Sequence, residues 1–139
     1  IEAMLKRPSV RLSEAHEDDL ADKDCLIIDS FGLLSSIYRY GQIAYIGGGF
    51  GAGIHNTLEA AVYGMPVLFG PRYHKFKEAK DLIAVGGGFS ITDDSSFRTK
   101  MDELLTDPTA LETSGQAAGD FVKNSVGATD QILRQIHIR

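Results

Sequence analysis

The sequence predicts an α/β fold in which helices flank a parallel β-sheet. Short apolar runs alternate with helical patterns between Cys25 and Leu105, and this rhythm is typical of right-handed βαβ crossovers. The runs that predict strands are residues 9–13, 25–28, 43–46, 66–69 and 89–91. Ligands of parallel sheets bind at the carboxyl ends of the strands. The loops after Ile28, Ile46 and Phe69 therefore share one candidate edge.

Most of the predicted helices have a recognisable start or stop signal. Asp29-Ser30 offers an N-cap for a helix over residues 31–40, which Gly41 ends. A second helix begins near Asn56 and ends at Gly64. The remaining predicted helices cover residues 74–85, 96–105 and 108–138, the last with polar interruptions that include Gly127.

The helix at 96–105 has a cap and an apolar face. Asp93, Asp94 or Ser95 caps it. The side chains predicted to face inward are Phe97, Met101, Leu104 and Leu105.

The first 28 residues carry weaker signals. The chain opens with Ile1, and residues 1–5 resemble part of a helix that has no start signal, so we expect a fragment of a longer protein. Residues 14–24 are acidic and predict a solvated loop. The run 25–28 is the pattern of a strand covered on both faces, with Cys25 as a buried small hydrophobe.

Composition fits one domain over residues 1–139 and excludes several function classes. The net charge is −5, with 14 basic and 19 acidic residues, which gives no footprint for nucleic acid. The single cysteine rules out an internal disulfide. No apolar run approaches the roughly 18 residues that cross a bilayer, and no signal peptide is visible, so we expect a soluble fragment.

The glycine-rich segment 47–53 is the most informative feature. It connects a predicted strand to a predicted helix, and this arrangement brings backbone amides close to an anion. A Walker A motif is excluded because no Lys-Ser/Thr pair follows the glycines. Gly47-x-Gly49-x-x-Ala52 matches the relaxed dinucleotide pattern. However, the acidic residue expected after the next strand is missing, because Phe69 leads into Gly70-Pro71.

Asn56 and Glu59 allow two interpretations. As N-cap and N3 residue they form a capping box that stabilises the helix by about 1 kcal/mol. Alternatively, Glu59 accepts hydrogen bonds from two sugar hydroxyls while the amides of residues 54–57 meet a phosphate.

The basic residues after the predicted strand 66–69 also allow two interpretations. Arg72, His74, Lys75 and Lys77 form either a solvated turn or a cationic rim for phosphate or carboxylate. His55 is a ligand contact, a loop-fixing side chain or neither. The four histidines are too scattered for a metal site, and no Ser or Cys has the setting of a nucleophile.

Taken together, these motifs resemble the C-terminal domain of 3-deoxy-D-manno-octulosonic acid (Kdo) transferase, from about Val10 through Gly127. The blocks that carry the resemblance are Asp29-x-x-Gly32-x-Leu34, Tyr38, Gly47-Gly48-Gly49-Phe50, Gly53-x-His55-Asn56-x-Leu58-Glu59, Gly64-x-Pro66-Val67-Leu68-x-Gly70-Pro71 and Phe76-x-Glu78.

The resemblance implies a Rossmann-like parallel sheet that forms the C-terminal half of a GT-B glycosyltransferase, truncated at its N-terminus. In that family the C-terminal domain binds the donor CMP-Kdo, and no cofactor is needed. The missing N-terminal domain supplies the lipid A precursor site, the catalytic carboxylate and the membrane association. The implied setting is lipopolysaccharide synthesis at the cytoplasmic face of the bacterial inner membrane.

Carried over onto this sequence, the resemblance implies donor contacts and no catalytic residue in the fragment. Glu59 would hold the ribose, and amides near Asn56 would hold the phosphate. Arg72 would lie at the rim of the cleft. The implied donor-binding residues are Gly49, Phe50, Gly53, His55, Asn56, Glu59 and Arg72.

Two residues depart from the family pattern. Many members have Ser where Gly49 stands, and Asn where Lys75 stands. The first change removes a hydroxyl and the second adds a charge.

We expect the chain alone to bind donor weakly or not at all, and to catalyse nothing. The alternatives are the donor domain of a GT-B enzyme that uses a UDP-sugar (a hexosamine transferase or UDP-sugar 2-epimerase) and a non-catalytic nucleotide-binding module.

Overall fold

A computed structural model describes residues 7–11, 13, 22–28, 34–51, 53, 54 and 56–138, with the backbone alone at 34, 35 and 126–138. The chain divides into two compact units, Ile1–Ile37 and Tyr38–Arg139. Each unit is described by itself. The predicted cap Asp29-Ser30 and most of the acidic segment 14–24 lie outside the described residues, as do residues 1–5.

The first unit contains a small parallel sheet. Strand β1 (Ser9–Arg11) pairs with β2 (Cys25–Ile27), and α2 (Leu34–Ile37) follows. Alternation along β2 leaves Cys25 and Ile27 partly buried but Leu26 44% exposed. The predictions of a strand covered on both faces and of a buried cysteine are therefore wrong, because successive side chains point to opposite faces and one face meets solvent.

The second unit contains a three-stranded parallel sheet in the order β3-β4-β5. This sheet confirms the predicted parallel α/β architecture, although the described strands form two sheets and not one. The described elements of the second unit are the 3₁₀ helix η3 (Tyr38–Tyr40), β3 (Ala44–Ile46), α3 (Leu58–Ala61), β4 (Val67–Phe69), α4 (Lys77–Val85), β5 (Gly88–Ser90), α5 (Asp94–Thr106) and α6 (Pro108–Ile138).

The central strand β4 is buried on both faces, and its alternating side chains divide the core in two. Val67 and Phe69 face a core that also contains residues of α3, α4 and α6. Leu68 faces the opposite way, into a smaller core with Ile91 and with Leu104 of α5. Strand β3 forms one edge of the described sheet, since it pairs only with β4 there.

Helix α5 starts and packs largely as its sequence predicts. Asp93 is the N-cap, and its carboxylate accepts a hydrogen bond from the Ser96 amide at 2.7 Å. Ser96 Oγ in turn accepts from the Asp93 amide at 3.1 Å, which completes a capping box. Leu104 is buried, but Leu105 is 62% exposed. The prediction that Leu105 faces inward is wrong, because a 100° step per residue carries it past the apolar face.

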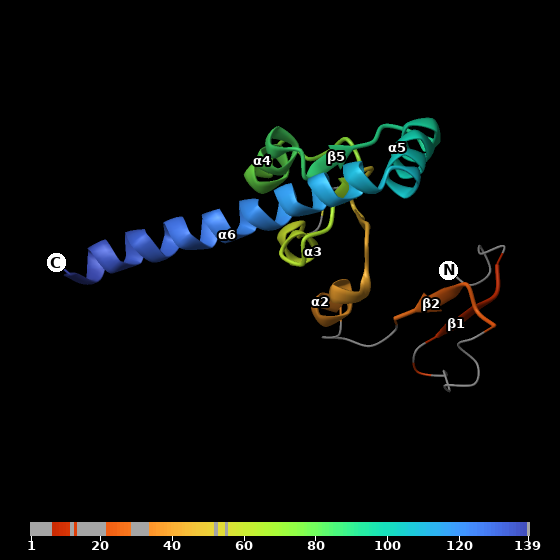
Figure 1. Cartoon of the computed structure of the whole chain (residues 1–139), viewed down its shortest axis with the longest axis horizontal. Helices are drawn as coiled ribbons and strands as arrows, with labels where there is room; N and C mark the ends of the chain where they lie inside the picture. The colour runs from red at the N-terminus through yellow and green to blue at the C-terminus, as the bar shows by residue number, and fades with distance from the viewer. Residues whose placement is uncertain are drawn as a thin grey trace. The chain divides into compact units, whose positions relative to one another are not determined.

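Helix α6 is continuous, whereas the sequence predicted interruptions. Figure 1 shows it as a long rod, and it contacts α3, α4 and α5. Two of its glycines are needed for close packing: a Cβ at Gly115 would overlap the carbonyl oxygen of Gly64, and one at Gly119 would lie 3.3 Å from Gly64 Cα. Close contact with the turn after α3 therefore offsets the low helix propensity of these glycines.

Candidate functional site

The glycine loop after β3 folds back on itself at Gly48. The amides of Gly51 and Gly53 both donate to the Gly48 carbonyl at 3.0 Å. Gly48 has φ 91° and Gly53 has φ 144°, values that other residues rarely adopt. The loop therefore has a defined shape, which its glycines make possible.

Gly49 brings this loop into direct contact with the segment after β4. A Cβ on Gly49 would overlap the backbone nitrogen of Gly70, and a Cβ on Gly70 would lie 2.6 Å from the Gly49 carbonyl carbon. Both glycines are buried. Gly49 is thus a packing residue in this fold, and it has no room for the serine that many relatives are expected to carry.

Arg72 fastens the same two segments together. Its amide donates to the Gly49 carbonyl at 2.9 Å, and its guanidinium Nη1 donates to the Gly51 carbonyl at 2.8 Å. The side chain is otherwise exposed. A guanidinium has five N–H donors, and among the described residues only this one side-chain bond is found. The tether holds the cation at the loop while leaving donors for an anion.

The helix after the loop is shorter than predicted. Only Leu58–Ala61 is α-helical, and the chain continues as tight turns to Gly64. The N-cap residue is Thr57, whose side chain makes no capping bond, and Asn56 Oδ1 accepts from the Leu58 amide at 2.9 Å one residue before it. A four-residue helix has little macrodipole. An anion here would depend on single amides and nearby cations.

Glu59 is exposed on α3 and lies near Tyr38 of η3. Burial raises the pKa of the Tyr38 hydroxyl above its ordinary value of 10.0, and the negative charge of Glu59 raises it further. Among the described residues, no hydrogen bond from Glu59 back to Asn56 is present, so the second half of the predicted capping box is not formed. The carboxylate is accessible to a ligand.

Two adjoining cavities lie beside the loop and share Phe76. The first, here called the Asn56 cavity, has about 410 Å³ and is lined by Ile54, Asn56, Thr57, Leu58, Phe76 and Glu78. The second, called the Arg72 cavity, has about 280 Å³ and is lined by Arg72, His74, Lys75 and Phe76. Gly53 fits beneath the shared ring, because a Cβ there would come within 3.1 Å of Phe76.

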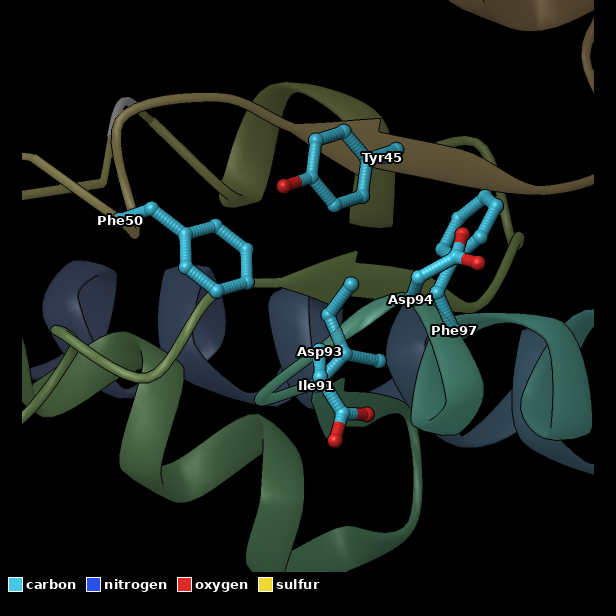
Figure 2. A pocket seen from close by; sticks show the side chains of 6 residues that line it. All are labelled: Tyr45, Phe50, Ile91, Asp93, Asp94 and Phe97. Carbon is cyan, nitrogen blue, oxygen red and sulfur yellow. The ribbon is translucent and has the colours of Figure 1, made fainter.

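Phe50 lines a third, aromatic cavity of about 420 Å³ (Figure 2). The rings of Phe50 and Tyr45 point into the same space above Ile91. Tyr45 also meets Phe97 edge-to-face with ring centroids 5.8 Å apart. Phe50 is 52% exposed and does not line the Asn56 cavity.

The predicted site residues therefore fall into three groups. Gly49, Gly53 and Arg72 shape one loop, and Asn56 lies beside it at a cavity. Glu59 and Phe50 each lie apart from that cavity's lining, while His55 is outside the described residues. Sequence reasoning assigned no role to Phe76 or Glu78, although both stood in a quoted motif.

The described residues contain no group of three or more His, Cys, Asp or Glu side chains that could hold a metal ion. Within the same part of the chain, no helix is long and apolar enough to cross a membrane.

Comparison with known proteins gives a consistent result. No protein-family model matches the chain. The 3-deoxy-D-manno-octulosonic acid transferase of Aquifex aeolicus (strain VF5) is 39% identical over 85 residues, which is 60% of this chain and 24% of the relative. The transferase of Rickettsia conorii is 33% identical over 116 residues, covering 81% and 25%. That of Bordetella pertussis is 33% identical over 115 residues, covering 79% and 26%.

The chain thus spans about a quarter of the length of these relatives. Among solved structures, the C-terminal CMP-Kdo binding domain of WaaA from Acinetobacter baumannii superimposes with a TM-score of 0.72 at 26% identity, covering 82% of this chain and 60% of that one. The resemblance that the motifs indicated is therefore confirmed, and the chain is a homologue of the C-terminal domain of the Kdo transferases.

Proposed function

We propose that this chain is the donor-binding part of a glycosyltransferase that transfers Kdo from CMP-Kdo to a lipid A precursor. The observation that supports this most is the fastening of the glycine loop by Gly49, Gly70 and Arg72 beside two open cavities. The loop and the segment that it contacts follow the carboxyl ends of β3 and β4, where parallel sheets bind ligands. The solved neighbour is a domain that binds CMP-Kdo.

In this proposal the anionic and hydroxyl groups of the donor meet different residues. The exposed guanidinium of Arg72 faces the phosphate together with amides near Asn56. Glu59 accepts hydrogen bonds from the ribose hydroxyls. No cofactor or metal takes part, because the donor itself carries the activated sugar.

The rest of the reaction is assigned to parts of the enzyme outside this chain. The acceptor site, the catalytic carboxylate and the association with the cytoplasmic face of the inner membrane belong to the N-terminal portion. The chain alone is then expected to bind donor weakly and to transfer no sugar.

A chemical-shift titration of the chain with CMP, and separately with UMP, tests the proposal. We expect CMP to shift amides confined to residues 47–59 and 70–77, with UMP binding more weakly. Glu59→Ala should weaken CMP binding. Absent or scattered shifts with CMP would contradict the proposal, and a preference for UMP would favour a UDP-sugar enzyme. Kdo transfer by the fragment alone would refute the assignment of catalysis to the N-terminal portion.

A further inference from the structure

The Asn56 cavity presents hydrogen-bonding groups that suit hydroxyls. The bond from the Leu58 amide occupies Asn56 Oδ1, so the two N–H donors of the Asn56 side chain remain for a ligand. Glu78, in the first turn of α4, lines the same cavity and offers acceptor oxygens. A sugar hydroxyl both donates and accepts, and it is matched by an amide donor beside a carboxylate acceptor.

Glu78 has no interaction partner among the described residues that would prevent it from binding a ligand. Its side chain is exposed, and among the described residues it has no ion pair or hydrogen bond. By contrast, Glu103 pairs with Lys100 at 2.8 Å and Asp94 with Arg98 at 2.9 Å. Glu59, the carboxylate that the sequence favoured, does not line the Asn56 cavity.

The Arg72 cavity has the opposite charge and is held in place by its surroundings. Arg72 is tethered to the Gly51 carbonyl, and His74 stacks on Tyr73 with ring centroids 4.4 Å apart. Lys75 adds a second full positive charge. A carboxylate or phosphate is favoured beside Arg72 and Lys75 in this cavity, whereas Glu78 disfavours an anion close to its own carboxylate in the Asn56 cavity.

Phe76 lies between these two environments, because its ring lines both cavities. A ligand that spans them needs an anionic group on one side and hydroxyls on the other, with C–H groups against the ring. An acidic sugar combines all three features in one molecule. A nucleotide combines phosphate and ribose hydroxyls, so it is the alternative source of the same chemistry.

We propose that Glu78 binds hydroxyl groups of the transferred acidic sugar in the Asn56 cavity while the sugar carboxylate lies in the Arg72 cavity. This inference rests on the proposed function and extends it, since it adds a specificity-determining carboxylate distinct from Glu59. The opposite charges of the two cavities fix the direction in which the sugar lies.

The experiment compares CMP-Kdo with CMP, binding to the whole 139-residue chain, by chemical-shift titration. Glu78→Gln keeps the size of the side chain and removes its charge. We expect it to weaken CMP-Kdo binding about tenfold, as for loss of a charged hydrogen bond, and to leave CMP binding within about twofold. The matched control Glu112→Gln, an exposed residue on α6, should change neither.

Three outcomes overturn the inference. Unchanged CMP-Kdo binding by Glu78→Gln removes any role for this carboxylate. Equal weakening for CMP and CMP-Kdo, together with loss of the effect when 2′-deoxy-CMP replaces CMP, assigns Glu78 to the ribose. Unequal unfolding midpoints of Glu78→Gln and wild type would mark a structural role. If the wild-type chain binds neither compound, the weak donor binding proposed for the chain alone fails, which is a different result from all of these.

Discussion

The contact between Gly49 and Gly70 gives the sharpest test of the structure. An alanine Cβ at position 49 would lie 2.6 Å from Gly70 Cα and closer still to the Gly70 nitrogen, while ordinary contacts begin at 3.4 Å, so the two segments must separate by at least about 0.8 Å. Such a shift also lengthens the 2.9 Å bond from the Arg72 amide to the Gly49 carbonyl. Overpacking of this kind costs about 1–3 kcal/mol. We therefore expect Gly49→Ala to be destabilised by that amount.

Equilibrium unfolding in urea measures this loss, and a melting temperature confirms it at about 4–8 °C per kcal/mol for a unit of this size. Gly51→Ala is the matched control, because it lies in the same loop and, among the atoms of the described residues, its Cβ would meet only the Gly48 carbonyl oxygen at 3.8 Å. It should stay within about 0.5 kcal/mol of wild type. If Gly49→Ala and Gly51→Ala have equal stability, the close approach of the two loops is wrong. Gly49→Ser would then be tolerated as well.

Three further predictions concern stability. The raised pKa of Tyr38 means that the folded state holds this proton more tightly, so stability should fall as the pH rises above about 10. In urea unfolding, Tyr38→Phe should lose less unfolding free energy than wild type between about pH 9 and pH 11. The same loss in both proteins would contradict the pKa shift. The amide and hydroxyl of Ser96 lower the pKa of Asp93 below its ordinary value of 3.8, so this cap stabilises above that pH and is lost in acid. The melting temperature of Asp93→Asn should therefore fall less than that of wild type as the pH drops below about 4. An equal fall in both proteins would argue against the cap. Leu82 of α4 is fully buried, so Leu82→Ala should lower the free energy of unfolding by about 2–5 kcal/mol. Leu105 is exposed, so Leu105→Ala should change it by no more than about 0.5 kcal/mol. Comparable losses for the two leucines would reverse their assigned environments.

Local patterns predicted the sheet of the second unit well. The apolar runs 43–46 and 66–69 contain β3 and β4, and 89–91 is shifted by one residue from β5. These runs are short and continuous, as expected for strands that helices cover. Asp93 could be placed as one of three capping candidates because caps depend on the side chain and the few amides that follow it.

Features that depend on distant residues were harder to predict. Nothing local shows that Gly115 of α6 must fit against Gly64, so this contact could not be predicted from the helical pattern. Likewise, the contact of Gly49 with Gly70 joins residues 21 positions apart and cannot be seen in the loop alone. In both cases glycine is chosen for the space it leaves to a neighbour.

The candidate site was predicted in part for the same reason. Spacing placed Asn56 at the start of a helix and Arg72 after a strand, and both positions follow from local order along the chain. The cavity that joins Asn56 to Glu78 arises from two separate loops that meet at the sheet edge. The sequence motif singled out Glu59, and only the three-dimensional arrangement shows that Glu78 lines this cavity whereas Glu59 does not.

The outer side of β3 affects how the isolated chain behaves in a test tube. This strand pairs only with β4 in the described sheet, and Tyr45 beside that side is 46% exposed. Within the described part of residues 38–139 this side of β3 has no partner strand, and a strand edge next to aromatic surface is where another copy could pair. Tyr45→Lys is therefore the first substitution to try if concentrated samples of the chain self-associate.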